Sequence, residues 1–281
     1  MSNGAQMRSR PSDDWRTILE QVCKKHFGIS PEVFVEALQM SPNARGYILG
    51  SLSEMLLRQH LDRLGYSTRR IKEKWVGEKH HHGDLYVSRD GKGWFVVESK
   101  GLKSNAERWH KIADVDSSRA SLEKWFGRKR SGEIKEWWHS LSAQRKERIL
   151  RCEAFNRACV FETHFVSGTA GRAGREIATP RKSEFHVVAL DLFLRTGVHE
   201  FVFASSSALE PAESYPEHLK QNYLLDIVVP GADDGPSFAK PWTKDFGEVF
   251  ATLKHPVRET EMQIDERKPG EREAEESDSD P

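Results

Sequence analysis

Three polar residues that could form a hydrolytic site occur in the stretch GDLYVSRDGKGWFVVESKG, residues 83–101. The run WFVV predicts a strand, because aromatic and β-branched residues favour that structure, and it leads directly into Glu98, Ser99 and Lys100. Residues two apart on a strand face the same side, so Glu98 and Lys100 project together while Ser99 points to the opposite face. A second carboxylate, Asp84, begins the preceding strand-like segment.

The turn of this hairpin decides whether Asp84 joins the other two groups. A five-residue loop centred on Gly91 places Asp84 opposite Glu98, on the same face. A two-residue turn at Asp90 and Gly91 would instead place Asp84 opposite Val97, on the wrong face. A converging site therefore requires the longer loop or a bulge.

Two carboxylates and a lysine on one face suit a hard divalent cation. Directly opposed residues have Cβ atoms about 4.5 to 5.5 Å apart, and Mg²⁺ accepts one or two carboxylates together with water and a substrate phosphate. Such an ion polarises a phosphoryl oxygen and makes a nucleophile of its bound water at neutral pH. Lys100 would place its ammonium on that water or on the developing phosphorane charge. Without the metal, one of the two carboxylates, Asp84 or Glu98, would bind a proton.

A helix is predicted before the hairpin, from Gly50 to Gly65. Ser51 and Glu54 have the spacing of a capping box at the start of this helix, and Gly65 is expected to end it. The alternative role of Glu54 is to bind a second metal ion or a water molecule beside the carboxylates of the hairpin. It shares a helical face with leucines that should pack on the sheet, which are Leu57, Leu61 and Leu64.

A helix glutamate (Glu54), an aspartate at the start of one strand (Asp84) and a Glu-x-Lys at the end of the next resemble the PD-(D/E)xK nuclease superfamily. Its best-known members are the type II restriction endonucleases. The resemblance covers roughly residues 50–101 and includes the order helix, strand, strand. It implies that Asp84 and Glu98 bind Mg²⁺, for which Mn²⁺ can substitute, and that Lys100 activates water.

The hairpin departs from the family pattern at one position. Gly83 stands where the family has a proline, a departure that we expect to matter little. A solvated strand end, with a surface ion pair worth ~0 to 1 kcal/mol, would also account for Asp84, Glu98 and Lys100. The histidines of residues 80–82 do not predict a metal cluster, because consecutive residues of an extended segment alternate between faces.

Two basic segments are candidates for contacting nucleic-acid phosphates. Residues 103–151 are helical in composition, with about thirteen bases against seven acids, and a Gly-rich basic loop spans residues 167–183. Lys and Arg that neutralise phosphates give a salt-dependent affinity, whereas the simpler alternative is a solvated charged surface. The candidate contact residues are Lys103, Arg128, Lys129, Arg130, Arg172, Arg175, Arg181 and Lys182.

The predicted fold class is α/β. Helices are expected over residues 15–23 and 31–39, and strands over 158–166, 185–194, 201–205 and 223–229. The resemblance implies a restriction-endonuclease-like core, with a central mixed β-sheet flanked by helices and a helical insert. The expected organisation is an N-terminal arm with short helices (1–44), a nuclease domain (45–256) with its helical basic insert at about 103–151, and a disordered acidic tail (257–281).

Net charge is zero over 281 residues, but the charges are unevenly distributed. Residues 258–281 hold about ten acids and four bases, which leaves the rest basic and suited to an anionic partner. The tail could cover that basic surface, or it could only keep the protein soluble. No apolar run approaches the ~18 residues of a membrane span, and residues 1–12 lack a signal-peptide core, so we expect a cytoplasmic protein, or a nuclear one in a host with a nucleus. The three scattered cysteines are expected to be reduced.

The resemblance implies a restriction-type endonuclease acting on double-stranded DNA, with DNA as its partner. By the same resemblance we expect a homodimer and a companion methyltransferase encoded nearby. A repair, recombination or structure-specific nuclease would use the same core on branched or single-stranded DNA. A non-catalytic DNA-binding module with a decayed site is the third alternative, against which the joint presence of Asp84, Glu98 and Lys100 argues.

Overall fold

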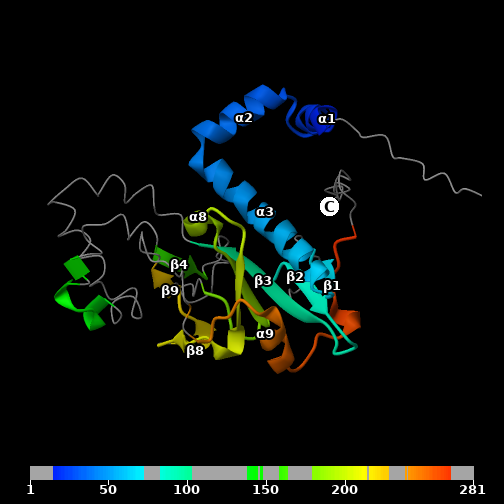
Figure 1. The fold of residues 1–281 in the computed structure, drawn as a ribbon. Helices are drawn as coiled ribbons and strands as arrows, with labels where there is room; N and C mark the ends of the chain where they lie inside the picture. Colours follow the sequence, from blue (N-terminus) through cyan, green and yellow to red (C-terminus); the bar gives the residue numbers. More distant parts are fainter. Residues whose placement is uncertain are drawn as a thin grey trace, which may run out of the picture. The chain divides into compact units, whose positions relative to one another are not determined.

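A computed structural model describes residues 15–72, 83–102, 138–144, 146–147, 158–163, 179–213, 215–227, 238 and 240–266 (Figure 1). The chain divides into two compact units, one of residues 1–48 with 267–281 and the other of residues 49–266. The predicted helices of the first unit are confirmed as α1 (Trp15–Phe27) and α2 (Pro31–Met40). The residues singled out for chemistry all belong to the second unit.

Helix α3 (Pro42–Arg63) starts well before the position that we predicted. The Ser41 hydroxyl accepts a backbone N–H three residues on, at 3.3 Å, and a proline follows it, which is the usual chemistry of a helix start. Ser51 therefore lies inside the helix, and the predicted capping box of Ser51 and Glu54 is wrong. The predicted end is confirmed, since Gly65 has φ +82°, a conformation that glycine adopts without strain.

A five-stranded mixed sheet forms the centre of the second unit, with strand order β1-β2-β3-β5-β6. Only β3 and β5 run parallel, and the other neighbours are antiparallel. The mixed α/β class is thus confirmed. The strands are β1 (Ser67–Arg70), β2 (Leu85–Ser88), β3 (Phe95–Gly101), β5 (Val187–Asp191) and β6 (Phe201–Ser205).

Two smaller sheets accompany the central one. The predicted strands β4 (Ala158–Glu162) and β9 (Asn222–Ile227) pair with each other and not with the five-stranded sheet. A hairpin of β7 (Pro211–Ala212) and β8 (Tyr215–Leu219) was not predicted. The expectation of strands around one sheet is wrong in this respect, because strand composition does not determine which strands pair.

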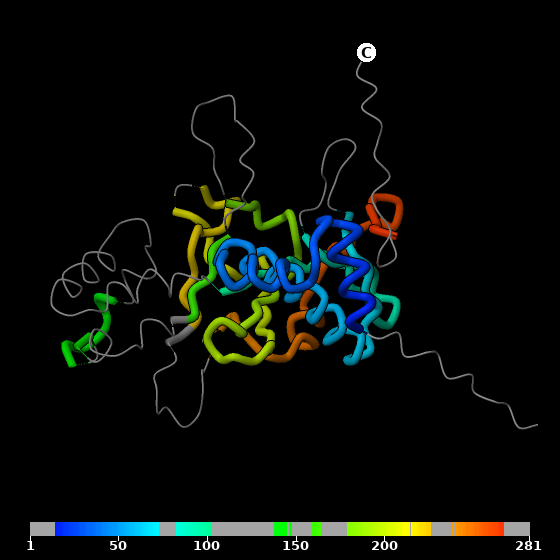
Figure 2. Tube along the Cα trace, turned by 90° about the horizontal axis from the view of Figure 1, so that it is seen from above, coloured from blue at the N-terminus to red at the C-terminus, as the bar shows by residue number. Residues whose placement is uncertain are grey.

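Apolar side chains cover both faces of the central sheet. On one face, Leu57 and Leu61 of α3 pack with Phe246 of α9 (Phe246–Thr252) against inward residues of β2, β3, β5 and β6. Figures 1 and 2 both show α9 beside β6, in agreement with the 5.1 Å separation of the Phe203 and Phe246 rings. Leu64 is 45% exposed, so its predicted packing on the sheet is wrong.

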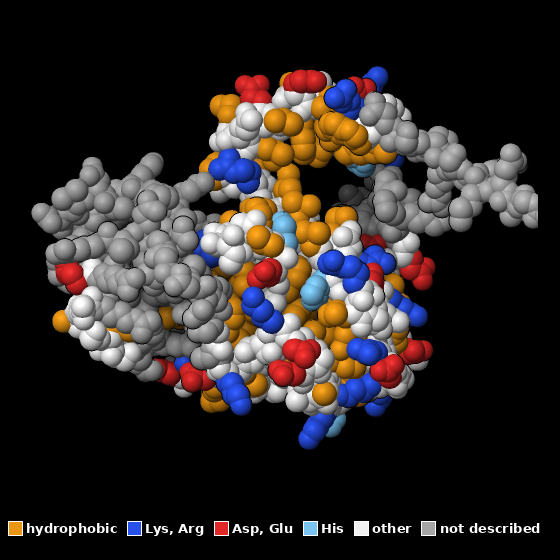
Figure 3. All heavy atoms as spheres, in the orientation of Figure 1, with side chains coloured by type: hydrophobic (Ala, Val, Ile, Leu, Met, Phe, Trp, Pro, Cys, Tyr) orange, Lys and Arg blue, Asp and Glu red, His pale blue; other side chains and the backbone are white. Residues whose placement is uncertain are grey.

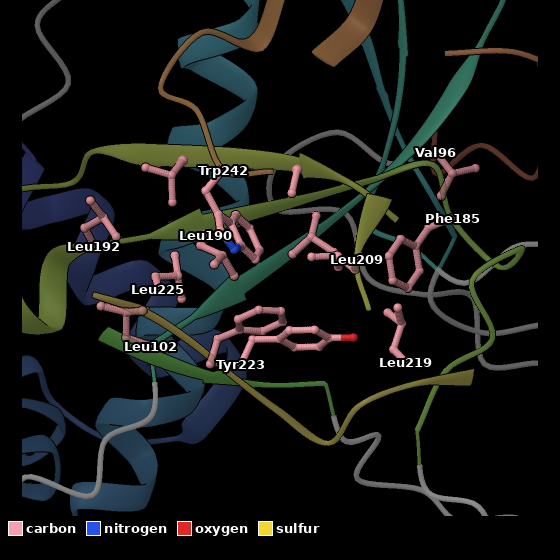
Figure 4. Packing of buried hydrophobic residues seen from close by; sticks show 14 of the residues in the cluster. Val96, Leu102, Phe185, Leu190, Leu192, Leu209, Leu219, Tyr223, Leu225 and Trp242 are labelled. Carbon is pink, nitrogen blue, oxygen red and sulfur yellow. The ribbon is translucent and has the colours of Figure 1, made fainter. Parts of the chain in front are cut away.

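The opposite face of the sheet packs against the β4–β9 pair. Figure 4 shows Leu190 of β5 close to Trp242 and Tyr223. The ring of Phe161 on β4 stacks on Tyr223, with ring centroids 5.1 Å apart. Cys159 is buried there with a free thiol. Cys23 of α1, in the other unit, is also buried and free, and the third cysteine, Cys152, lies outside the described residues.

The chain continues past residue 256 as an ordered part of the fold. Trp94 pairs with Val257 and Ile71 with Ile264 in single antiparallel bridges, and the Asp265 N–H donates to the Arg70 carbonyl at 2.9 Å. The predicted disordered tail is therefore wrong for residues 257–266, whose apolar residues pack on the sheet. Residues 267–281 lie outside the described part of the chain.

Three further short helices are α8 (Phe193–Thr196), η2 (Ser206–Ala208) and η3 (Glu259–Glu261). Residues 138–140, 143–144 and 146–147 are also helical. Most of the predicted insert over 103–151 lies outside the described residues. Among the described helices, none combines the length and apolar character that a membrane crossing needs.

Candidate hydrolytic site

The β2–β3 hairpin has the register that a converging site requires. Leu85 pairs with Val97 and Val87 with Phe95, and extending this pairing by one residue places Asp84 opposite Glu98. The loop between the strands is the longer one, residues 89–93. Its residues Asp90, Gly91 and Gly93 all have positive φ. The prediction that depended on a five-residue loop is therefore confirmed.

Backbone and side-chain hydrogen bonds hold Asp84 at the end of this hairpin. Its N–H donates to the Val97 carbonyl at 3.0 Å, and its carbonyl accepts the Ile71 N–H at 2.9 Å. Its Oδ2 atom accepts the Ser99 N–H at 2.6 Å. The Asp84 carboxylate is thus attached directly to the strand that carries Glu98 and Lys100.

Glu98 and Lys100 form a close ion pair on β3. Lys100 Nζ lies 2.5 Å from Glu98 Oε1, and the side chains are 26% and 7% exposed, respectively. Alternation along the strand turns Ser99 the other way, where its hydroxyl lies 3.1 Å from that of Ser53 on α3. The predicted division of these three residues between two faces is confirmed.

The electrostatics of the site show that four charged groups converge. Burial, followed by the negative charges of Glu98 and Glu54, raises the pKa of Asp84 well above its usual value, against the opposing effect of Lys100 and the Ser99 N–H. Burial acts to lower the pKa of Lys100, but the charges of Glu98, Asp84 and Glu54 together raise it. An excess of negative charge is therefore concentrated around one ammonium, an environment that favours a further cation.

Helix α3 brings Glu54 to this edge of the sheet together with Ser53. Arg70 of β1 lies 3.6 Å from Glu54 (Nη2 to Oε2), and 3.7 Å from Asp265 (Nη1 to Oδ2). We did not predict Ser53, Arg70 or Asp265 as neighbours of the site. Ser53 could have been identified from its position next to Glu54 in the sequence. Arg70 and Asp265 could not, because they meet only through the long-range pairing of residues 263–265 with β1.

Gly83, which precedes Asp84, has a packing role that the sequence did not reveal. A Cβ atom at this position would lie 2.3 Å from Val96 Cγ1 and 3.2 Å from the Val97 carbonyl oxygen. Such contacts require either the Val96 side chain or the backbone to shift. This close approach therefore favours glycine at position 83, and the expectation that its replacing the pattern's proline matters little stays a prediction.

The remaining predicted site residues do not all fall in the described part of the chain. Lys103, Arg128, Lys129, Arg130, Arg172 and Arg175 lie outside it, as do the histidines of residues 80–82. Arg181 pairs with His218 in a single bridge, and Lys182 Nζ donates to the Ser207 carbonyl at 3.1 Å, so the structure does not bring either of them to the carboxylates. In the view of Figure 3, acidic and basic side chains are interspersed over the lower part of the described surface.

Within the described residues, no set of three or more His, Cys, Asp or Glu side chains is arranged to hold a metal ion. The candidate metal ligands are the two carboxylates of Asp84 and Glu98, with Glu54 nearby. This donor set fits a hard cation that keeps several waters, because Mg²⁺ needs only one or two protein carboxylates. It does not fit a soft metal or a closed structural site.

Comparisons of the chain with protein-family models, with curated proteins and with solved structures found no match. Two carboxylates, an ammonium and a cation bound between them can activate water and stabilise charge on a phosphoryl group.

Proposed function

We propose that the protein is a Mg²⁺-dependent DNA endonuclease that hydrolyses phosphodiester bonds, with a PD-(D/E)xK site. The observation that carries this proposal is the convergence of three groups: the Asp84 carboxylate accepts the N–H of Ser99 at 2.6 Å, between Glu98 and Lys100, which are ion-paired at 2.5 Å. A surface ion pair at a solvated strand end accounts poorly for this arrangement, because Glu98 is only 6% exposed. Burial of a charged group has a cost that proteins usually accept only where the group has a partner or a function.

The topology supports a restriction-endonuclease-like core. The carboxylates lie on an antiparallel hairpin that follows α3, and the chain returns after the insert to form β5, parallel to β3. In mixed and parallel sheets the carboxyl ends of adjacent parallel strands form a common ligand-binding edge. Glu98 and Lys100 lie at that end of β3.

Each residue of the site has a distinct role in the proposed reaction. Asp84 and Glu98 would hold Mg²⁺, which when bound supplies a Lewis acid and an activated water. The Ser99 N–H orients the Asp84 carboxylate, and Glu98 orients the Lys100 ammonium. Lys100 stabilises the negative charge that develops on the phosphoryl group, where a fixed cation is most effective. Glu54 adds negative charge at the same edge and is itself held beside Arg70.

Cleavage of supercoiled and linear duplex DNA, with and without Mg²⁺, tests this proposal. The native protein should give Mg²⁺-dependent products, and Glu98→Ala and Lys100→Ala should each lower the rate by about 10²-fold or more, as expected for loss of a charged group from a reacting centre. Lys220→Ala is a control, because Lys220 pairs with Glu210 on the surface. The control should cleave at the native rate.

The products also separate the alternatives. Discrete fragments from duplex DNA favour the restriction-type enzyme, which is expected to act as a homodimer, whereas cutting only of branched or single-stranded DNA favours a repair or recombination nuclease. DNA binding by the folded native protein without cutting of any of these substrates would leave a non-catalytic binding module and contradict the proposal.

A further inference from the structure

Arg70, the last residue of β1, lies between two carboxylates that come from distant parts of the chain. Its Nη2 atom is 3.6 Å from Oε2 of Glu54 on α3, and its Nη1 atom is 3.7 Å from Oδ2 of Asp265. The Asp265 side chain is only 4% exposed, and its N–H donates to the Arg70 carbonyl at 2.9 Å. Because a buried carboxylate is costly unless it is paired, Asp265 fixes the Arg70 guanidinium in place beside Glu54.

The strand register places this arginine on the face of the sheet that α3 covers. Arg70 pairs with Leu85 across β1 and β2, and Leu85 packs in the same cluster as the leucines of α3. Asp84 precedes Leu85 and therefore alternates to the opposite face, which is the face of Glu98. Glu54 and Arg70 thus approach the candidate site from the α3 side, whereas the two candidate ligands lie on the other side of the strands.

Glu54 is close enough to the site to act on it through its charge. After burial and the charge of Glu98, the charge of Glu54 also raises the pKa of Asp84. Within the described residues, however, Glu54 does not join these two carboxylates in a set of three that could hold a metal ion. The charge of Glu54 therefore reaches the site, but its oxygen atoms do not complete a set of metal ligands.

We infer that Asp84 and Glu98 hold a single divalent cation to which Glu54 is not a ligand. Arg70 is a positioning residue, because it offsets the charge of Glu54 and sets how strongly that charge attracts the cation. Two carboxylates suffice for a hard cation that keeps several waters, and groups outside the ligand set tune the affinity of a metal site. The inference rests on the proposed function, because it takes Asp84 and Glu98 as the ligands.

Binding of Mn²⁺ to the full-length protein, without DNA, tests the inference. The electron paramagnetic resonance signal of free Mn²⁺ gives both the stoichiometry and the affinity. The native protein and all variants should bind one ion. At low salt, Glu54→Gln should weaken binding by about three- to tenfold and Arg70→Gln should tighten it by a similar factor, because each removes one charge near the cation. The double variant loses one charge of each sign and should return to the native affinity.

Ionic strength separates a charge effect from the loss of a ligand. The Arg70 and Glu54 side chains are 40% and 29% exposed, so the affinity differences should shrink in 1 M salt, where the screening length is only about 3 Å. The loss of a direct ligand would persist there. Arg89→Gln is the matched control, since Arg89 is 43% exposed and pairs with Asp90 at 3.2 Å in the loop at the other end of the hairpin. It should bind Mn²⁺ as the native protein does at every salt concentration.

Three results overturn the inference: two ions bound by the native protein, an equal loss of affinity in Glu54→Gln at low and high salt, or no tightening in folded Arg70→Gln. Glu54→Gln keeps the pair of Arg70 with Asp265, so it tests the inference even if Arg70→Gln does not fold. Mg²⁺-dependent cleavage of DNA beside any of these results leaves the nuclease proposal standing. One bound ion with the expected changes in affinity, but without cleavage, supports the inference and contradicts the nuclease proposal. A native protein that binds no Mn²⁺ contradicts both.

Discussion

At the scale of single residues, Asp84 is the group for which function and stability are most clearly opposed. Its pKa in the folded protein is raised well above the usual value, by burial first and by Glu98 and Glu54 next. The folded state therefore binds a proton at Asp84 more readily than the unfolded state does. Ionised Asp84 then disfavours folding, and a bound cation would relieve this effect.

We predict that Asp84→Asn stabilises the metal-free protein at neutral pH, by on the order of 1 kcal/mol. The asparagine can still accept the Ser99 N–H, but it carries no charge. Below the unfolded-state carboxyl pKa of about 3.9 the gain should be absent, and it should grow as pH rises through the raised folded-state pKa. Urea unfolding in EDTA over a pH series measures this difference.

The control for this prediction is Asp90→Asn, which changes an aspartate in the loop of the same hairpin whose side chain is 85% exposed. It should alter stability little at any pH. Added Mg²⁺ should stabilise the native protein more than Asp84→Asn, because a ligand stabilises the state that binds it. A loss of stability in Asp84→Asn at neutral pH in EDTA would show that the carboxylate is not under electrostatic strain.

At the scale of elements, the hairpin was the part of the fold that the sequence determined most closely. Alternation is a local signal, so the strands and the shared face of Glu98 and Lys100 could be predicted, whereas the turn residues left the loop open between two and five residues. Pairing between distant segments could not, because neither composition nor periodicity contains it. The separate β4–β9 sheet and the contact of Arg70 with Asp265 both depend on such pairing.

The start of α3 was missed for a different reason. Its signal, a serine followed by a proline at residues 41–42, is local and was available in the sequence. The capping-box spacing of Ser51 and Glu54 competed with it, although this start leaves the glycines at positions 46 and 50 inside the helix. Glycine inside a helix costs only about 1 kcal/mol, which packing of Leu57 and Leu61 on the sheet offsets.

The close approach at Gly83 leads to a prediction about the whole β2–β3 hairpin. Gly83→Ala should destabilise the protein by about 1 to 3 kcal/mol, because the added methyl group must displace Val96 or the strand itself. Gly101→Ala is the matched control at the other end of β3, where a Cβ meets no described atom within 4 Å, and it should be neutral or slightly stabilising. Thermal unfolding of both variants compares them, and equal stability would contradict the tight packing at Gly83.

At the scale of the whole molecule, residues 257–266 are part of the fold. Residues 257–266 add hydrogen bonds to the sheet that include Val257 N–H to the Trp94 carbonyl at 2.8 Å and Lys72 N–H to the Gln263 carbonyl at 3.0 Å. Trp94 also donates from its Nε1 to Glu259 at 3.2 Å. Deleting residues 258–281 would therefore remove part of the fold together with the acidic charge.

Two truncations separate these contributions. Removal of residues 267–281 should leave the unfolding temperature unchanged, whereas removal of 257–281 should cost roughly 3 kcal/mol, because several net hydrogen bonds of about 1 kcal/mol each are lost. The shorter truncation removes about six acids and three bases but none of the hydrogen bonds of residues 257–266, so its effect on DNA binding comes from charge.

If residues 267–281 only keep the protein soluble, DNA affinity and its salt dependence will not change in this truncation. A higher affinity with a steeper salt dependence would instead mean that the tail competes with DNA for the basic surface, because more phosphate contacts form when it is absent.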